Sequence, residues 1–266
     1  MRFAIFVDGP NLVGSLEKLG LRVEDYEAFY LYITGRAVEA WTGCIVGSGR
    51  PMAYLWRVFW YQIGHMDELQ LDNRTLLDHL RGFFENNREL HRAYMAMAAR
   101  EHPEAAGDEL ADAAWRLCLE EGRTWYERKR NALEGMKRFN YSVRRNTQFI
   151  EIIESGHWKV DLLRRQVTEK GVDTALAVDV VTLVDSYDVA VVLSADADMI
   201  PSLSYAKQQG KHVSVVDLVR GSPPPRRPRH GSSRLKSQAD FVVPIYEAEL
   251  LDQEIATPRP GWNGAG

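Results

Sequence analysis

The chain has little of several features that mark common protein classes. It contains two cysteines, Cys44 and Cys118, in 266 residues. They lie too far apart in sequence to suggest a disulfide framework or a metal-binding pair, so a reducing compartment is the simplest setting. None of the seven histidines stands at a metal-type spacing from another. No apolar run approaches the roughly 18 residues that a membrane-spanning helix needs, so we expect no membrane association.

Two further absences concern targeting and charge. The N-terminus lacks the apolar core of a secretory signal, because the run Phe3–Val7 ends at Asp8. We therefore expect a cytoplasmic protein. The net charge of −4 lacks the excess of cations that nucleic-acid-binding proteins often carry. Residues 220–236, however, hold six Lys and Arg side chains and no acid. This Pro-rich and Ser-rich basic loop either holds a phosphate backbone or is a plain solvated loop.

What the chain does have is a set of aspartates placed at the ends of apolar segments. The stretch from Lys170 to Pro201 predicts a helix that begins near Asp173 and then a buried strand, Val189–Leu193. So apolar a strand is typical of the centre of a parallel sheet. The strand is followed directly by three polar residues, Ser194, Asp196 and Asp198.

The first apolar run of the chain ends in the same way. Phe3–Val7 is followed by Asp8 and, after Gly and Pro, by Asn11. Parallel strands would bring Asp8, Asp196 and Asp198 to one edge of the sheet, where ligands of open α/β sheets bind. Each aspartate taken alone is more simply a helix cap or a turn former. Taken together they predict a site for a hard divalent cation, Mg²⁺ or Mn²⁺, because like charges cannot all ionise at close range.

These motifs also carry a family resemblance. The order of DGPN after the first strand, KGVDTALAVD at the helix and SADAD after the later strand resembles the NYN domain, a PIN-like nuclease fold, and its LabA-like branch in particular. The resemblance covers residues 1–20 and about 145–247. It implies that Asp8, Asp173, Asp196 and Asp198 are the metal-binding acids, with Asn11 beside them. One position departs from the family pattern: Ala195 stands where Gly is usual, and Ala disfavours positive φ.

Other polar residues of this region allow two readings each. Lys170 is either a phosphate clamp or an ordinary helix-start lysine, and we favour the clamp. Ser194 would orient the water or the metal ligands. Asp179 lies on another helix face than Asp173, so it is a structural hydrogen-bonding residue. Substrate contacts in the basic loop are expected at Arg226, Arg227 and Arg229.

The predicted fold is an α/β three-layer sandwich with a central, mainly parallel sheet and a helical insertion. One NYN/PIN-like domain would span residues 1–250, with the insertion at about 66–145 and a flexible tail at 251–266. The insertion is a candidate homodimer surface, and its charged end is equally well a solvated face or a phosphate-contacting edge. Outside it we expect helices at 25–42, Thr147–Ser155 and Pro201–Gln209, and strands at Ala53–Tyr61, His157–Leu163, Lys211–Leu218 and Phe241–Ile245.

The function that follows is a metal-dependent nuclease, most simply an endoribonuclease acting on single-stranded RNA, with DNA as an open alternative. A second hypothesis is a catalytically impaired RNA-binding or regulatory NYN module. A phosphatase of the haloacid type also places Asp after a first strand. That chemistry needs a second Asp two residues later, where this chain has Pro10.

Overall fold

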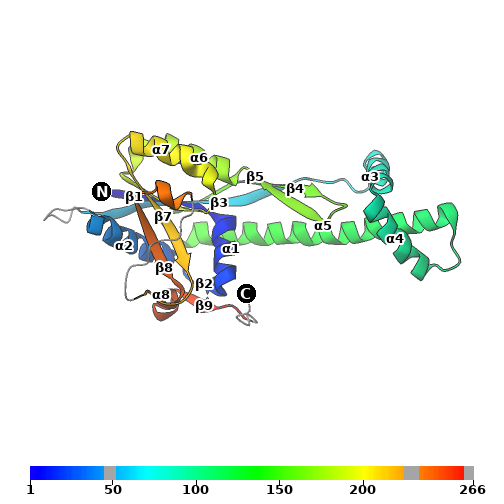
Figure 1. Ribbon diagram of the computed structural model, residues 1–266, viewed down its shortest axis with the longest axis horizontal. Helices are drawn as coiled ribbons and strands as arrows, with labels where there is room; N and C mark the ends of the chain where they lie inside the picture. The colour runs from blue at the N-terminus through cyan, green and yellow to red at the C-terminus, as the bar shows by residue number, and fades with distance from the viewer. Residues whose placement is uncertain (45–51, 225–233, 261–266) are drawn as a thin grey trace. The chain divides into compact units, whose positions relative to one another are not determined.

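The computed structural model describes residues 1–44, 52–224 and 234–260, and the chain forms two compact units (Figure 1). The first unit comprises Met1–Ile63, Phe139–Gly156 and Gly171–Gly266. The second comprises Gly64–Arg138 and His157–Lys170. The predicted basic-loop residues Arg226, Arg227 and Arg229 lie outside the described residues. The division into one domain with an insertion at 66–145 stays a prediction.

The elements alternate along the chain as expected for an α/β protein. The strands are β1 (Arg2–Asp8), β2 (Leu21–Val23), β3 (Tyr54–Met66), β4 (Ile150–Asp161), β5 (Gln166–Lys170), β6 (Val189–Leu193), β7 (His212–Val219), β8 (Phe241–Tyr246) and β9 (Ala256–Pro258). The α-helices are α1 (Gly9–Leu19), α2 (Tyr26–Cys44), α3 (Arg74–Asn86), α4 (Arg88–Glu101), α5 (Gly107–Asn146), α6 (Val172–Thr182), α7 (Ile200–Gln208) and α8 (Glu247–Asp252). Single turns of 3₁₀ helix are η1 (Val184–Ser186), η2 (Ala197–Met199) and η3 (Lys236–Gln238).

The main sheet has the strand order β5-β4-β3-β1-β6-β7-β8. The pairs β1–β3, β1–β6, β6–β7 and β7–β8 are parallel, whereas β5 runs antiparallel to β4. Val7 pairs with Leu193, so the strands β1 and β6 end side by side at the centre of the sheet. The sheet is therefore mainly parallel, as predicted.

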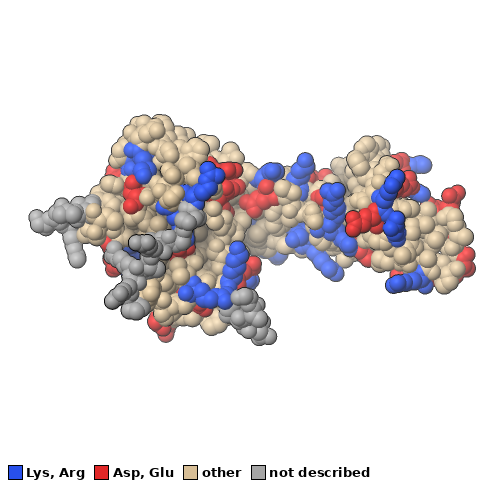
Figure 2. All heavy atoms as spheres, in the orientation of Figure 1, with Lys and Arg blue, Asp and Glu red and all other residues tan. Residues whose placement is uncertain are grey.

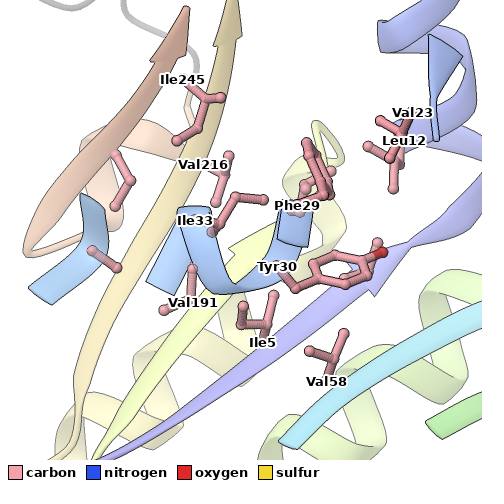
Figure 3. Packing of buried hydrophobic residues seen from close by; sticks show 14 of the residues in the cluster. Ile5, Leu12, Val23, Phe29, Tyr30, Ile33, Val58, Val191, Val216 and Ile245 are labelled. Carbon is pink, nitrogen blue, oxygen red and sulfur yellow. The ribbon is translucent and has the colours of Figure 1, made fainter. Parts of the chain in front are cut away.

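Helices cover both faces of this sheet in the first unit. In Figure 1, α1 and α2 lie on one face and α6 and α7 on the other. The first layer packs on side chains that alternate along the strands, such as Ile5 in β1 and Val191 in β6, which lie around Ile33 of α2 (Figure 3). The opposite face of β1 presents Phe6, which stacks on Phe59 at 5.3 Å between ring centroids. The molecule therefore has the predicted three layers.

Two expectations about secondary structure were wrong. Thr147–Ser155 was expected to be a helix that Gly156 ends, but Ile150–Asp161 is one continuous strand, β4. Its β-branched residues at 150 and 152 face the core, and Gly156 is buried within the strand. The tail was expected to be flexible from 251, but Ala256–Pro258 pairs antiparallel with β2. The residues 261–266 lie outside the described part.

The second unit has its own small core, built by the helices α3, α4 and the N-terminal half of α5. Its centre holds Phe84, Tyr94, Ala98, Ala113, Ala114, Trp115 and Cys118. The strands that pair within this unit are His157–Asp161 of β4 and Gln166–Lys170 of β5. A homodimer through these helices stays a prediction. Over the described residues, no helix is both long and apolar enough to cross a membrane.

Candidate active site

The candidate site lies between β1 and β6. There the chain changes the side of β1 on which it adds strands to the sheet. The chain leaves β1 through α1 on one face, and it leaves β6 through α7 on the other (Figure 1). Helices that diverge in this way open a crevice beyond the carboxyl ends of the two strands, which is the usual ligand site of open α/β sheets. Asp8 is the last residue of β1, and Ser194 follows the last residue of β6. The carboxyl ends of β1 and β6 therefore form the base of the candidate site.

Hydrogen bonds hold the carboxylate of Asp8 in place at the end of β1. Asp8 is 4% exposed, and its Oδ1 accepts the backbone N–H of Asn11 at 3.0 Å, which caps α1. Its Oδ2 accepts the hydroxyl of Ser194 at 3.1 Å. The same hydroxyl oxygen accepts the backbone N–H of Asp196 at 3.1 Å. Ser194, itself buried, thus links the ends of β1 and β6.

The next two acids lie in the turn after β6. The Oδ1 of Asp196 accepts the backbone N–H of Asp198 at 2.9 Å and so caps the 3₁₀ turn η2. Asp198 is exposed. The backbone at Ala195 has ordinary geometry, because the non-Gly residues with positive φ in the described part of the chain are Arg165 and Glu254. The replacement of the family's usual Gly by Ala therefore strains nothing here.

Glycines let a third segment approach the site. Asp173 lies in the first turn of α6, and the helix begins after Gly171, which has φ +95°. A Cβ on Gly171 would lie 3.0 Å from the carbonyl oxygen of Ser155, and one on Gly156 would lie 2.6 Å from Val172 Cγ2. Side chains at these positions would push the start of α6 away from β4. The two glycines thus set where Asp173 can lie.

The environment of Asp173 disfavours the ionised form of its carboxyl group. The pKa of Asp173 is raised to about 6 by its burial, by the negative charges of Asp8 and Asp196, by a hydrogen bond with Asp8 and by the charge of Asp198. No described Lys, Arg or His forms an ion pair with any of the four. The structure thus brings together acids from β1, α6 and the turn after β6, and within residues 1–44, 52–224 and 234–260 no cation forms an ion pair with them.

Divalent cations suit this donor set chemically. Mg²⁺ and Mn²⁺ bind carboxylate oxygens, and a shared cation would relieve the repulsion that raises the pKa of Asp173. Among the residues that the structure describes, no three His, Cys, Asp or Glu side chains are already arranged to hold a metal ion. The chemistry of the donors fits a cation, and the side chains would have to turn to coordinate it.

A small cavity of about 170 Å³ adjoins the acids and contains residues that sequence reasoning missed. Asn11 and Ser194 line it together with Ser15, Asp217 and Lys236. Asp217 forms an ion pair with Lys236 at 2.7 Å. Because Val215 of β7 pairs with Val192 of β6, Asp217 lies at the same end of the sheet as Ser194. Asp217 could be recognised only once β7 is known to lie beside β6, because the acid then stands near the carboxyl end of a neighbouring parallel strand.

Two other residues considered in the sequence analysis, Lys170 and Asp179, are not among the four acids of the candidate site. Lys170 is the last residue of β5 and belongs to the second unit, so its role as a phosphate clamp stays a prediction. The expectation that Asp179 has a structural role agrees with its contact, because its Oδ2 accepts the hydroxyl of Tyr61 at 2.7 Å.

Comparison with known proteins identifies the family to which this chain belongs. The sequence model of the NYN domain matches residues 65–245, about two thirds of the chain. The matched range includes Asp173, Asp196 and Asp198 and begins after Asp8 and Asn11. An uncharacterized protein of Methanocaldococcus jannaschii is 32% identical over 91 residues, which are 34% of this chain and 34% of the relative. The match thus spans about a third of that relative. No solved structure matches the chain.

Proposed function

Since the chain belongs to the NYN domain family, a family of PIN-like nucleases, we propose that it is a metal-dependent endoribonuclease that cleaves single-stranded RNA. The observation that carries this proposal is the meeting of Asp8, Asp173, Asp196 and Asp198 at the reversal point of the sheet, with no described cation paired to them. The order of the sequence motifs favours the LabA-like branch of the family. The scarcity of cysteine favours action in the cytoplasm.

Each residue has a defined part in this proposal. The four aspartates would hold Mg²⁺ or Mn²⁺, which when bound lowers the pKa of water and stabilises negative charge on a phosphate. Ser194 is a positioning residue, since its one proton is donated to Asp8. Asn11 keeps Asp8 in place through its backbone N–H, and its side chain lines the adjacent cavity. Hydrolysis that breaks the bond between phosphorus and O3′ leaves a 5′-phosphate and a 3′-hydroxyl.

The test is a cleavage assay with labelled single-stranded RNA and DNA in EDTA, Mg²⁺ or Mn²⁺. We expect the parent protein to cut RNA when a metal is supplied, and Asp8→Asn and Asp196→Asn to lose at least about 100-fold in rate while remaining folded. Asp185→Asn is the matched control, because Asp185 is exposed and precedes β6 at its other end. Cleavage by both site variants at the parent rate would refute the assignment.

The second candidate, a catalytically impaired RNA-binding module, is motivated by Ala195 and by the net negative charge of the chain outside residues 220–236. The ordinary backbone at Ala195 removes the first reason, because the turn after β6 does not need a residue with positive φ. The same assay separates the two functions. RNA binding that is insensitive to EDTA, with no products under any metal condition, would favour the binding module.

A further inference from the structure

An open groove of about 1050 Å³ lies within the second unit, and none of the four aspartates lines it. Its walls come from the junction of α3 and α4 on one side and from the β4–β5 hairpin on the other. The groove combines four cations, Arg88, Lys159, Arg164 and Lys170, with two acids, Glu89 and Asp161. All four cations are exposed.

The cations of the groove are only partly compensated, and the charge of Lys159 also acts on Asp67. Arg164 lies 3.9 Å from Asp161. Arg88, Lys159 and Lys170 form no ion pair with any residue that the structure describes. Lys159 pairs with Thr168 in the ladder, and Lys170 with His157, so both lysines stand on one face of the hairpin. Figure 2 shows Lys and Arg side chains intermixed with Asp and Glu on the face drawn.

An aromatic side chain completes the groove. Phe83 of α3 is 60% exposed, although its neighbour Phe84 is buried in the core of the unit. Its ring meets that of His79 edge-to-face at 5.2 Å, which leaves most of the ring open to solvent. An exposed phenylalanine beside unpaired cations matches the chemistry of single-strand binding, in which bases stack on aromatic rings and cations contact the backbone phosphates.

We propose that this groove, whose lining includes none of the four aspartates, is a docking site for single-stranded RNA. The inference rests on the proposed function for its ligand class. Phe83 stacks a base, and Lys159, Lys170 and Arg88 contact phosphates. Recognition of this kind depends on the backbone and on stacking, so it is tolerant of sequence.

The stacking part is tested by fluorescence anisotropy with a labelled single-stranded RNA of about 12 nucleotides in EDTA. Phe83→Ala is expected to weaken binding by about 5- to 100-fold. Tyr141→Ala is the matched control, because Tyr141 is an aromatic residue of α5 that is 65% exposed and outside the groove. Equal affinity of the Phe83 variant and the parent overturns the proposal.

The electrostatic part is tested by the salt dependence of the same binding. The double variant Lys159→Ala, Lys170→Ala should reduce the slope of log K against log salt by about 1.4, at roughly 0.7 per phosphate contact. Arg92→Ala, Arg100→Ala removes two exposed cations of α4 that do not line the groove, and it should leave the slope unchanged. Equal slope changes in both variants would show a diffuse charge effect and overturn the proposal.

The outcomes separate this inference from the proposed function. Loss of RNA affinity in the groove variants, in a protein that cuts no RNA with any metal, supports the groove and rejects the nuclease. Cleavage by a parent protein whose groove variants bind normally rejects the groove alone. Binding of a polyglutamate peptide as tightly as RNA, unaffected by Phe83→Ala, would show an acidic protein as the partner and overturn the proposal.

Discussion

The repulsion among the four aspartates predicts that removing one charge stabilises the metal-free protein. Asp173 is the informative position, since its pKa is raised from 3.8 to about 6 by burial and by the other three acids. Asp173→Asn keeps the size of the side chain and removes the charge. We therefore expect the variant to unfold at higher denaturant concentration than the parent in EDTA at neutral pH.

The magnitude follows from linkage between protonation and folding. A shift of about 2 pKa units corresponds to about 3 kcal/mol between the two protonation states. Asp173 is half-buried, so screening by solvent reduces this to roughly 1–2 kcal/mol. The proton is held more tightly in the folded state, so its stabilising contribution is fully present below about pH 4 and is lost as pH rises through about 6. The variant should match the parent in acid and exceed it at neutral pH.

The assay is urea unfolding at a series of pH values in EDTA, with Asp185→Asn as the control for a change of net charge. The control should run parallel to the parent across the whole range. Mg²⁺ should then stabilise the parent more than the Asp173 variant. A variant that is less stable than the parent at neutral pH would show that the acids do not repel one another as the structure indicates.

Two further predictions concern the parts that hold the strand ends in place. A Cβ on Gly9 would lie 2.4 Å from the carbonyl oxygen of Tyr61, so Gly9→Ala should lower the free energy of unfolding by more than about 2 kcal/mol. Gly14→Ala in the same helix meets nothing within 4 Å and should raise it by about 0.5–1 kcal/mol, which a thermal melt of both variants checks. Arg2 donates to Asp188 through its backbone N–H at 2.7 Å and its guanidinium at 3.0 Å, and hydrogen bonding from Arg2 lowers the pKa of Asp188. Asp188→Asn should lower the free energy of unfolding by about 1 kcal/mol at neutral pH. The difference between variant and parent should disappear as pH falls below about 4 through the pKa of Asp188 in the folded protein, because only the ionised carboxylate gains from the interaction with Arg2. A pH-independent difference would contradict this.

The sequence allowed the centre of the fold to be predicted because two local signals agree there. Phe3–Val7 and Val189–Leu193 are short apolar runs that each end in polar residues, and both are central strands of the sheet. General rules for parallel sheets then place Asp8 and Asp196 at one edge. The local pattern was sufficient because both segments form the strands that their apolar runs predict.

Other features depend on contacts between distant segments, and local pattern could not reveal them. Gly156 resembles a helix stop in sequence, but the structure uses it as a strand residue whose missing Cβ makes room for Val172 and Ile63. Asp217 lies inside an apolar run and draws attention only once β7 is known to lie beside β6. Phe83 and Phe84 are adjacent in sequence, and only packing decides that the second is buried and the first exposed.

A substitution at Asp8 best distinguishes a structural role of the aspartates from a functional one. As a helix cap it accepts the N–H of Asn11, and an asparagine at this position would cap the helix equally well. Since the single amide oxygen then caps the helix, the amide NH2 group faces Ser194, whose oxygen would have to accept where its proton was donated before. If Asp8 serves only as a cap, Asp8→Asn should change stability little, through the contact with Ser194, and should leave activity unchanged. If its negative charge is needed to hold a cation, the same variant stays folded and loses cleavage. Because the substitution keeps the helix cap and changes only the contact with Ser194 besides the charge, loss of activity in a folded variant decides between the two readings.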